Sequence, residues 1–249
     1  MTVGTKTRLD VLLVERGLFP SRERARAYIL AGRVLINEQK VDKPGTAIAG
    51  DAAVRLLGDD MPYVSRGGLK LAAALTHWQI AVGARACLDV GTSTGGFTDC
   101  LLQNGARKVY AVDVAYGQLD WKLRQDPRVI VKEKTNARHL KPENFPSPAD
   151  LAVIDCSFIS LKKILPPAVP LLQSAGKIIA LIKPQFEAGK AEVDKGRGVI
   201  TDAAIHERVL TELRDFVGAQ AGLCWRGVVE SPLLGPAGNK EFLALIEKC

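Results

Sequence analysis

The first sixty residues predict a small unit of two helices and short strands. Residues 9–14 carry an apolar stripe that ends at Gly17, which is typical of a short helix closed by glycine. Ser21 is a good helix N-cap and predicts a second helix that begins at residue 22 and ends before Gly32. Short apolar runs at 33–41 and 52–57 predict strands after this helix.

Beyond residue 62 the chain changes to short runs rich in Val, Ile and Leu, separated by stretches with helical periodicity. These runs lie at 85–91, 107–114, 128–133, 149–158 and 176–186. Alternating strands and helices imply crossover connections, so we expect a mostly parallel sheet with helices on both faces. The last two runs, LCWRGVVES and KEFLALIE, are too close together for a helical crossover and predict an antiparallel hairpin at the sheet edge.

The segment GDDMP at 58–62 combines Gly, Pro and two acids without periodicity and predicts a linker. It divides the 249 residues into a small α+β domain over 1–60 and an α/β domain with a Rossmann-like sheet over 61–249. The net charge of +7 is uneven, because residues 1–57 hold ten Lys/Arg and six Asp/Glu. A basic small domain favours a polyanionic partner.

Composition argues against a membrane-spanning, secreted or metal-binding protein. No apolar run reaches the ~18–20 residues that a membrane helix needs, and Glu15 and Arg16 interrupt the N-terminal apolar patch, unlike a signal peptide. The five cysteines are odd in number and scattered, without a Cys-x-x-Cys pair. We therefore expect a cytoplasmic protein with reduced thiols, without a disulfide framework or a metal site.

A glycine-rich turn at 91–98 follows the first strand of the larger domain. Glycines let the backbone pass close to a ligand, and the next helix presents free N–H groups. The glycine spacing fits neither the dinucleotide fingerprint nor the Walker motif. Asp89 suits a cofactor with a positive amino-acid group, and Asp113 at the end of the next strand can accept ribose hydroxyls. These residues favour S-adenosylmethionine over NAD or ATP; the alternative is a strand–helix turn that simply needs glycine.

The motifs of the chain resemble the TlyA family of ribosomal RNA 2′-O-methyltransferases, some of which are named hemolysins. The resemblance is carried in order by SRGGLKL, LDVGTSTGGFTD, VDVAYGQLDW, DPRVIVKEKTNAR, DLAVIDCSFISL, LIKPQFEAGK and SPLLGPAGNKEF. The segments RLDVLLVERG and SRERARAYILAGRVLIN resemble the S4-type RNA-binding module of a ribosomal protein. The resemblance implies an FtsJ-like methyltransferase domain behind an S4-type domain. It implies cytidines of ribosomal RNA as substrate, in the large subunit and, as a further candidate, in the small subunit.

The resemblance also implies a catalytic tetrad, which falls on Lys70, Asp155, Lys183 and Glu241. Asp155 and Lys183 each follow a predicted strand, at the sheet edge where ligands bind. The ribose hydroxyl must be aimed at the methyl carbon and relieved of its proton. A lysine acts as base only where burial and a second cation lower its pKa from about 10.4. We expect Lys183 to be the base, with Lys70 as the neighbouring cation. Lys70 and Asp155 are expected to position the base and the hydroxyl, and Glu241 to hold the network.

The sequence, together with the resemblance, also indicates residues that bind the cofactor and the RNA. The expected S-adenosylmethionine contacts are Asp89, Gly91, Gly95, Gly96, Phe97, Thr98, Asp113 and Asn136. The expected RNA contacts are Arg8, Arg22, Arg26, Arg33, Lys40, Lys190 and Arg197. For Phe97 the alternative is a core position, and for the basic residues it is a solvated surface. The stretch 184–199 is charged and broken by glycines, and we expect a long loop there.

Two other functional classes compete with methyl transfer. A non-catalytic RNA-binding protein of the same fold predicts a broken tetrad, whereas all four residues are present. A membrane-active hemolysin needs a long apolar or amphipathic segment, which the sequence lacks.

The chain ends soon after Glu241 and resembles a compact form of the family, in which Cys156 replaces an aliphatic residue.

Overall fold

The structure is a computed structural model that describes residues 6–56 and 62–249. The chain divides into two compact units, residues 1–61 and 62–249. The domain boundary predicted at residues 60 and 61, and residues 58–61 of the predicted linker, lie outside the described residues.

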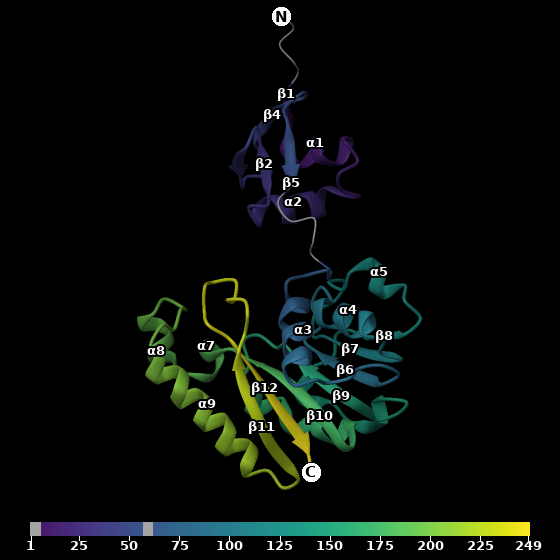
Figure 1. Ribbon diagram of the computed structural model, residues 1–249, viewed down its shortest axis with the longest axis vertical. Helices are drawn as coiled ribbons and strands as arrows, with labels where there is room; N and C mark the ends of the chain where they lie inside the picture. The colour runs from purple at the N-terminus through teal and green to yellow at the C-terminus, as the bar shows by residue number, and fades with distance from the viewer. Residues whose placement is uncertain (1–5, 57–61) are drawn as a thin grey trace, which may run out of the picture. The chain divides into compact units, whose positions relative to one another are not determined.

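The N-terminal unit combines two helices with two small antiparallel sheets (Figure 1). The helices are α1 (Leu9–Glu15) and α2 (Arg22–Leu30). The strands are β1 (Lys6–Arg8), β2 (Val34–Ile36), β3 (Gln39–Val41), β4 (Ala47–Ala49) and β5 (Val54–Leu56). One sheet has the order β3–β2–β5, and the other pairs β1 with β4.

The apolar stripe of the sequence forms the core of this unit. Leu9, Leu13 and Ile29 are fully buried in one cluster with residues of the strands. The Ser21 hydroxyl accepts a hydrogen bond from the backbone N–H of Arg24, which confirms Ser21 as the N-cap of α2. Burial of one apolar face on each short helix holds the two helices against the strands.

The second unit is built on a seven-stranded sheet in the order β11–β12–β10–β9–β6–β7–β8. Its strands are β6 (Ala86–Val90), β7 (Lys108–Val112), β8 (Val129–Lys132), β9 (Ala149–Ile154), β10 (Leu172–Ile182), β11 (Leu223–Glu230) and β12 (Phe242–Lys248). Strands β6 to β10 pair in parallel, whereas β12 is antiparallel to both β10 and β11. This order confirms the predicted parallel sheet with a C-terminal antiparallel hairpin.

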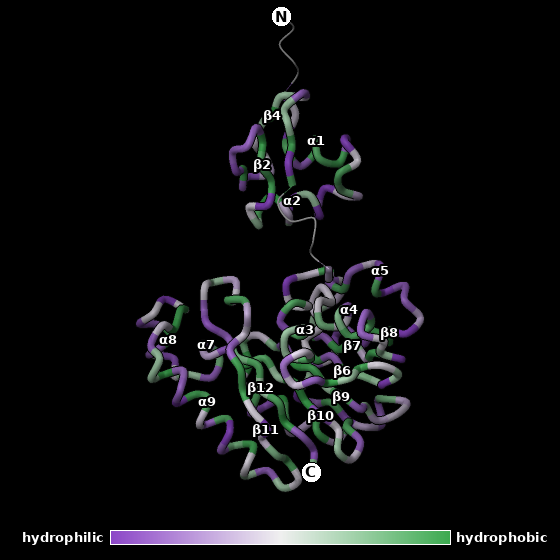
Figure 2. The backbone as a smooth tube through the Cα atoms, viewed as in Figure 1, coloured by the Kyte–Doolittle hydropathy of each residue, from purple (hydrophilic) through white to green (hydrophobic). Residues whose placement is uncertain are grey.

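Helices cover both faces of the sheet. They are α3 (Gly67–His77), α4 (Gly96–Gln103), α5 (Trp121–Arg124), α6 (Leu165–Ala168), α7 (Pro184–Glu187), α8 (Lys190–Lys195) and α9 (Ala203–Gly218). Leu71 of α3 and Leu101 of α4 belong to one buried cluster, and Leu165 of α6 and Val209 of α9 to another. Alternate side chains of a strand point to opposite faces, so the two clusters lie on opposite sides of the sheet. The hydrophobic strands between them are evident in Figure 2.

The stretch 184–199 holds two short helices, so the prediction of a long loop was wrong. Proline opens α7 at the first helical position, where its missing N–H costs no hydrogen bond. The Glu192 carboxylate accepts the backbone N–H of Gly189 at 3.0 Å, at the start of α8. The charge and glycine content of the stretch do not predict these hydrogen bonds, because the bonds depend on which donor faces which acceptor.

A disulfide bond joins Cys224 to Cys249, which corrects the expectation of reduced thiols throughout. The two cysteines are 25 residues apart, but the β11–β12 register sets Cys224 opposite Glu247, two residues from Cys249. The pairing depends on the hairpin register, which sequence spacing alone does not reveal. The free thiols are those of Cys87, Cys100 and Cys156.

Within residues 6–56 and 62–249, every helix is too short or too polar to cross a membrane. The longest described helix, α9, has 16 residues and buries only one face, with His206, Val209, Leu213 and Val217. The same part of the chain has no cluster of three or more His, Cys, Asp or Glu side chains able to hold a metal ion.

Candidate active site

The glycine-rich turn joins β6 to α4 and packs against its neighbours more closely than a side chain allows. Gly91 and Gly95 have φ values of +85° and +98°, a region that favours glycine. A Cβ on Gly91 would lie 2.5 Å from the carbonyl oxygen of Asp155, and one on Gly96 would lie 2.2 Å from Ser65 Oγ. The fold itself therefore needs these glycines, whatever ligand the turn binds.

A cavity of about 720 Å³ opens beside the turn, at the carboxyl ends of β6 and β7. Its wall includes Gly91, Ser93, Asp113, Val114 and Asn136. The Asp113 carboxylate accepts the backbone N–H of Ser93 at 2.7 Å and that of Ala115 at 2.8 Å, one on each oxygen. These bonds fix the carboxylate and leave lone pairs on both oxygens for hydroxyl donors.

Asn136 lies on the same wall and caps the short helix η1 (Ala137–His139). Its Oδ1 accepts the backbone N–H of Arg138 at 3.0 Å. Capping engages the amide oxygen, so the amide nitrogen is the group that Asn136 can offer as a donor to a ligand.

A second cavity, of about 780 Å³, shares Gly91, Ser93 and Asp155 with the first. It is lined by all four residues of the predicted tetrad, Lys70, Asp155, Lys183 and Glu241. Lys70 lies on α3, Asp155 and Lys183 directly follow β9 and β10, and Glu241 directly precedes β12. Because β9, β10 and β12 follow one another in the sheet, Asp155, Lys183 and Glu241 meet at one edge, and Lys70 of α3 contacts Glu241, 171 positions later in the chain.

The four side chains form two lysine–carboxylate pairs. Lys70 Nζ lies 2.5 Å from Glu241 Oε2, and both side chains are almost inaccessible to water. Lys183 Nζ lies 2.6 Å from Asp155 Oδ1 as an ion pair and donates a hydrogen bond to Ser157 Oγ at 2.9 Å. Each lysine thus contacts a carboxylate while both line the same cavity, and the role of Lys70 as the cation beside Lys183 stays a prediction.

Asp89 and Thr98, two of the expected cofactor contacts, lie beneath the turn and line neither cavity. Thr98 Oγ1 donates to Asp89 Oδ2 at 2.6 Å, and both side chains are fully buried. Burial raises the pKa of Asp89 to about 7, opposed by the hydrogen bond from Thr98. Asp89 Oδ1 has no hydrogen-bond partner among the described residues. The Asp89–Thr98 hydrogen bond therefore stabilises the turn from its buried side.

Gly95 and Phe97 also serve the packing of the turn. A Cβ on Gly95 would lie 2.3 Å from Leu123 Cδ1, so Gly95 accommodates the apolar side chain beside it. Phe97 is 3% exposed and belongs to the core cluster of α3 and α4, although its edge also lines the second cavity. Phe97 is therefore a core residue, as the alternative predicted, and it also lines the second cavity.

Sequence reasoning missed three residues at this site, Ser157, Phe158 and Phe186. The rings of Phe158 and Phe186 have centroids 4.9 Å apart and line both cavities. Phe158 is 90% exposed and has a φ of +62°, a strained conformation for a bulky residue. The available signal was the sequence SF directly after Asp155 and Cys156, at the end of a buried strand.

Four of the five basic residues predicted in the N-terminal unit fall into two groups. Arg8 Nε lies 3.0 Å from Asp10 Oδ1 and Arg22 Nη2 lies 3.1 Å from Asp10 Oδ2. Asp10 is buried, and the hydrogen bond from Arg8 lowers its pKa to about 2. Arg26 and Lys40 are exposed. Arg8 and Arg22 thus hold a buried carboxylate, whereas the other two face solvent.

The remaining basic residues are Arg33, Lys190 and Arg197. Arg33 lies over the ring of Tyr28, with 5.4 Å between the guanidinium carbon and the ring centroid. Lys190 opens α8 and Arg197 follows it, and both are exposed. Val193 and Gly198 line the second cavity. Lys190 is three residues before Val193 in the sequence, and Arg197 directly precedes Gly198.

Comparison with known proteins gives consistent matches for both units. The family model for FtsJ-like methyltransferases matches residues 63–248, and the S4 domain model matches residues 7–54. A Bacillus subtilis protein named as a candidate rRNA methyltransferase, YqxC, is 50% identical over 96% of this chain and 84% of that protein. The 16S/23S rRNA (cytidine-2′-O)-methyltransferase TlyA of Mycobacterium tuberculosis is 47% identical over 96% of this chain and 89% of that protein. A solved candidate hemolysin from Streptococcus thermophilus has a TM-score of 0.77 at 46% identity, over 98% of this chain and 89% of that one.

Proposed function

The chain belongs to the FtsJ-like methyltransferase family, and on this premise we propose that it methylates the ribose 2′-hydroxyl of a cytidine in ribosomal RNA, with S-adenosylmethionine as donor. One observation carries the proposal. Lys70, Asp155, Lys183 and Glu241 line the second cavity, and that cavity shares Gly91, Ser93 and Asp155 with the first. A methyl donor and a hydroxyl acceptor need two adjoining spaces of this kind.

The first cavity fits S-adenosylmethionine. Asp113, held by two backbone N–H groups, offers acceptor lone pairs to the hydroxyls of the cofactor ribose. Val114, an apolar side chain that is 71% exposed, offers a surface to the adenine at the same wall. The cofactor supplies a methyl group activated by a sulfonium. Asp89 and Thr98 act on it through the turn that they support, since neither lines the cavity.

In the second cavity the protein aims the ribose hydroxyl and accepts its proton. Lys183 is the proposed proton acceptor in its neutral form, which arises when its ammonium group gives a proton to water, and Asp155 and Ser157 hold its Nζ at 2.6 and 2.9 Å. As the oxygen–carbon bond forms and the carbon–sulfur bond breaks, the hydroxyl proton passes to the base. The Lys70–Glu241 pair ties α3 to the start of β12 and so fixes the opposite wall. Positioning supplies a large part of such a rate enhancement.

RNA recognition is proposed for surfaces on both units. The exposed ring of Phe158, with Phe186 behind it, offers a face on which a nucleobase can stack at the cavity mouth. Arg26, Lys40, Lys190 and Arg197 are exposed cations able to contact phosphates. Ribosomal subunits and their RNA are the proposed partners, which places the reaction in the cytoplasm. The match to TlyA supports cytidine as the target nucleotide.

The test is methyl transfer from S-[methyl-³H]adenosylmethionine to ribosomal RNA from cells that lack the gene. Naked RNA and isolated large and small subunits are assayed in parallel, and the RNA is then digested to nucleosides. We expect label in 2′-O-methylcytidine, and a matching gain of ribose methylation in cells that carry the gene. Label in a base-methylated nucleoside, or no label in any substrate, would contradict the proposal.

Two alternatives give different outcomes in the same preparation. A non-catalytic RNA-binding protein would bind the RNA without transferring label, and it would not need the tetrad in one cavity. A membrane-active hemolysin would release dye from vesicles of phosphatidylglycerol and phosphatidylethanolamine. We expect label transfer and no dye release from the same pure protein.

A further inference from the structure

The loop after β9 carries both partners of Lys183, yet the sheet does not hold its far end. The β9–β10 ladder ends at Ile154, so it does not reach the loop 155–160. Asp155 and Ser157, which contact Lys183 Nζ, lie on the first part of this loop. The near end is held by the Asp155 backbone N–H, which donates to the Val90 carbonyl at 2.9 Å. Contacts at the far end therefore complete the restraint on the loop that carries these two groups.

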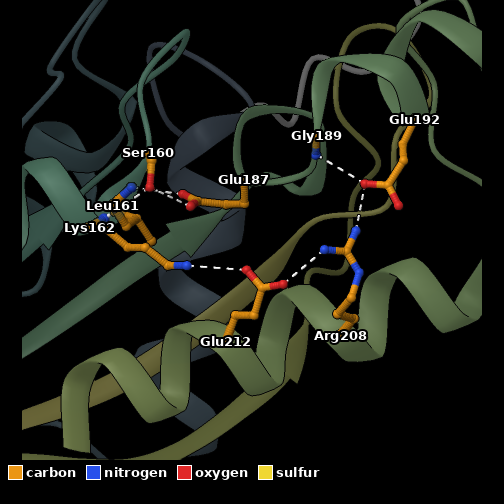
Figure 3. A network of polar contacts seen from close by, with 8 residues as sticks. All are labelled: Ser160, Leu161, Lys162, Glu187, Gly189, Glu192, Arg208 and Glu212. Atoms are coloured by element: carbon orange, nitrogen blue, oxygen red, sulfur yellow. Dashed lines mark hydrogen bonds and ion pairs between the residues drawn. The ribbon is translucent and has the colours of Figure 1, made fainter. Parts of the chain in front are cut away.

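Glu187 fixes that far end (Figure 3). Its Oε2 accepts the Ser160 hydroxyl at 2.6 Å, and its Oε1 accepts the Leu161 backbone N–H at 2.7 Å. Ser160 Oγ also accepts the backbone N–H of Lys162 at 3.1 Å and so caps η3 (Leu161–Lys163). Each carboxylate oxygen has its own donor, which fixes both the position and the rotation of the group.

Glu187 is the last residue of α7, four residues after Lys183, and this closes a ring of contacts. The ring runs from Lys183 Nζ to Asp155 and Ser157, along the loop to Ser160, and through Glu187 back to Lys183. The backbone N–H of Phe186 donates to the Lys183 carbonyl at 2.9 Å, and this helical turn completes the ring. A shift in any one link changes the separation of Lys183 from its partners.

Glu187 differs from the exposed ion pairs around it in Figure 3. Its side chain is half-buried, and burial raises its pKa despite the two hydrogen bonds. Lys162 lies 3.2 Å from Glu212, and Arg208 lies 2.5 Å from Glu192, with all four side chains between 34% and 44% exposed. Exposed pairs contribute little to holding a structure. The inner carboxylate, not the outer network, therefore restrains the loop.

We propose that Glu187 is a positioning residue for methyl transfer, which holds the loop 155–160 so that Asp155 and Ser157 keep Lys183 in place. The inference rests on the proposed function of this cavity. Glu187 lines neither cavity, so it contacts neither the RNA nor the cofactor directly. The loop that it holds also lines the first cavity, through Ser160 among others, but Asp113 and Val114, the proposed cofactor contacts, follow β7 instead. We therefore expect the loss of Glu187 to act on the chemical step and to leave cofactor binding intact.

The experiment compares E187D, E187Q and E187A with wild type in tritium transfer to ribosomal RNA from cells that lack the gene. E187D keeps the charge but shortens the side chain by one methylene, and we expect kcat to fall about ten- to a hundredfold. E187Q can still accept from Leu161 and donate to Ser160, so kcat should stay within about threefold of wild type. E187A loses both bonds and should match or exceed the loss in E187D. The control is E212Q, which alters only the exposed network and should leave kcat unchanged.

Cofactor affinity, thermal midpoint and a crystal structure separate positioning from general damage. We expect E187D to bind S-adenosylmethionine like wild type, keep its thermal midpoint and show a displaced Lys183–Asp155 contact. Wild-type kcat in E187D, an equal loss in E187Q, or a parallel loss of cofactor affinity would each overturn the assignment. Wild-type protein that transfers no methyl group refutes the proposed function instead. The displaced contact in the E187D crystal then remains the test of positioning.

Discussion

The two lysine–carboxylate pairs of the second cavity are chemically alike but differ in how far water reaches them. The Lys70 and Glu241 side chains are 9% and 1% exposed, whereas those of Lys183 and Asp155 are 11% and 24% exposed. The first pair joins a helix to a strand in the core, and the second joins two strand ends beside Ser157. Both pairs line the second cavity, and we propose different roles for them: the Lys70–Glu241 pair fixes one wall, and the Lys183–Asp155 pair acts on the substrate.

The largest effect is expected at the Lys183–Asp155 pair. Lys183→Ala removes the proposed proton acceptor, and kcat for methyl transfer should fall about 10²- to 10⁴-fold. Asp155 keeps access to water, so the thermal midpoint and the affinity for S-adenosylmethionine should change little. Lys177→Ala, at the middle of the same strand and six residues before Lys183, is the matched control and should retain wild-type kcat. Full activity in Lys183→Ala would remove the distinction between the two pairs.

The Lys70–Glu241 pair should instead show itself in stability. Lys70→Ala leaves Glu241 as an uncompensated buried charge, so the free energy of unfolding should fall by about 3–5 kcal/mol. The double variant K70M/E241L replaces both charges with apolar side chains and should recover most of that loss. Urea unfolding of both variants measures the difference. An unfolding free energy in Lys183→Ala that falls as far as in Lys70→Ala would show that burial does not separate the pairs.

The sequence allows the strands, the glycine turn and the tetrad positions to be predicted, because each depends on local pattern or on matched motifs. Partnership within the tetrad is not predictable in this way. Whether Lys70 faces Lys183 or Glu241 depends on the antiparallel return of β12 beside β10, which only the assembled sheet fixes. The roles of Glu187 and Ser157 depend on contacts across a loop, and no periodicity reveals them.

Asp89 sharpens the comparison, because it is a buried carboxylate that contacts no cation among the described residues. Its folded-state pKa is about 7, whereas an unfolded aspartate loses its proton near pH 4. Between these values the folded protein binds more protons, so this group makes stability fall as pH rises from about 4 to about 7. The contribution is up to about 4 kcal/mol.

Asp89→Asn removes this titration, and the loss of unfolding free energy between pH 5 and pH 8 should shrink. Urea unfolding at both pH values measures it, with Asp126→Asn as a control on an exposed ion pair. An unchanged pH dependence in Asp89→Asn would mean that the buried carboxyl titrates as it does in the unfolded chain. The contrast with Glu241, whose charge is neutralised by Lys70, would then lose its basis.

The smallest effect extends the same comparison to the N-terminal unit, where Arg8 binds the buried Asp10 and Arg26 faces solvent. Arg26→Ala should weaken binding to ribosomal RNA fragments a few-fold and lower the slope of log affinity against log salt by about 1, without changing the thermal midpoint. Arg8→Ala should lower the thermal midpoint by a few degrees, because Asp10 keeps only Arg22, and should leave the salt slope nearly unchanged. Fluorescence anisotropy between 50 and 200 mM salt, about the range over which phosphate contacts weaken most visibly, measures the slopes. A side chain that is ion-paired within the protein contributes less to counterion release. Equal slope changes in the two variants would therefore show that Arg8 also contacts phosphate.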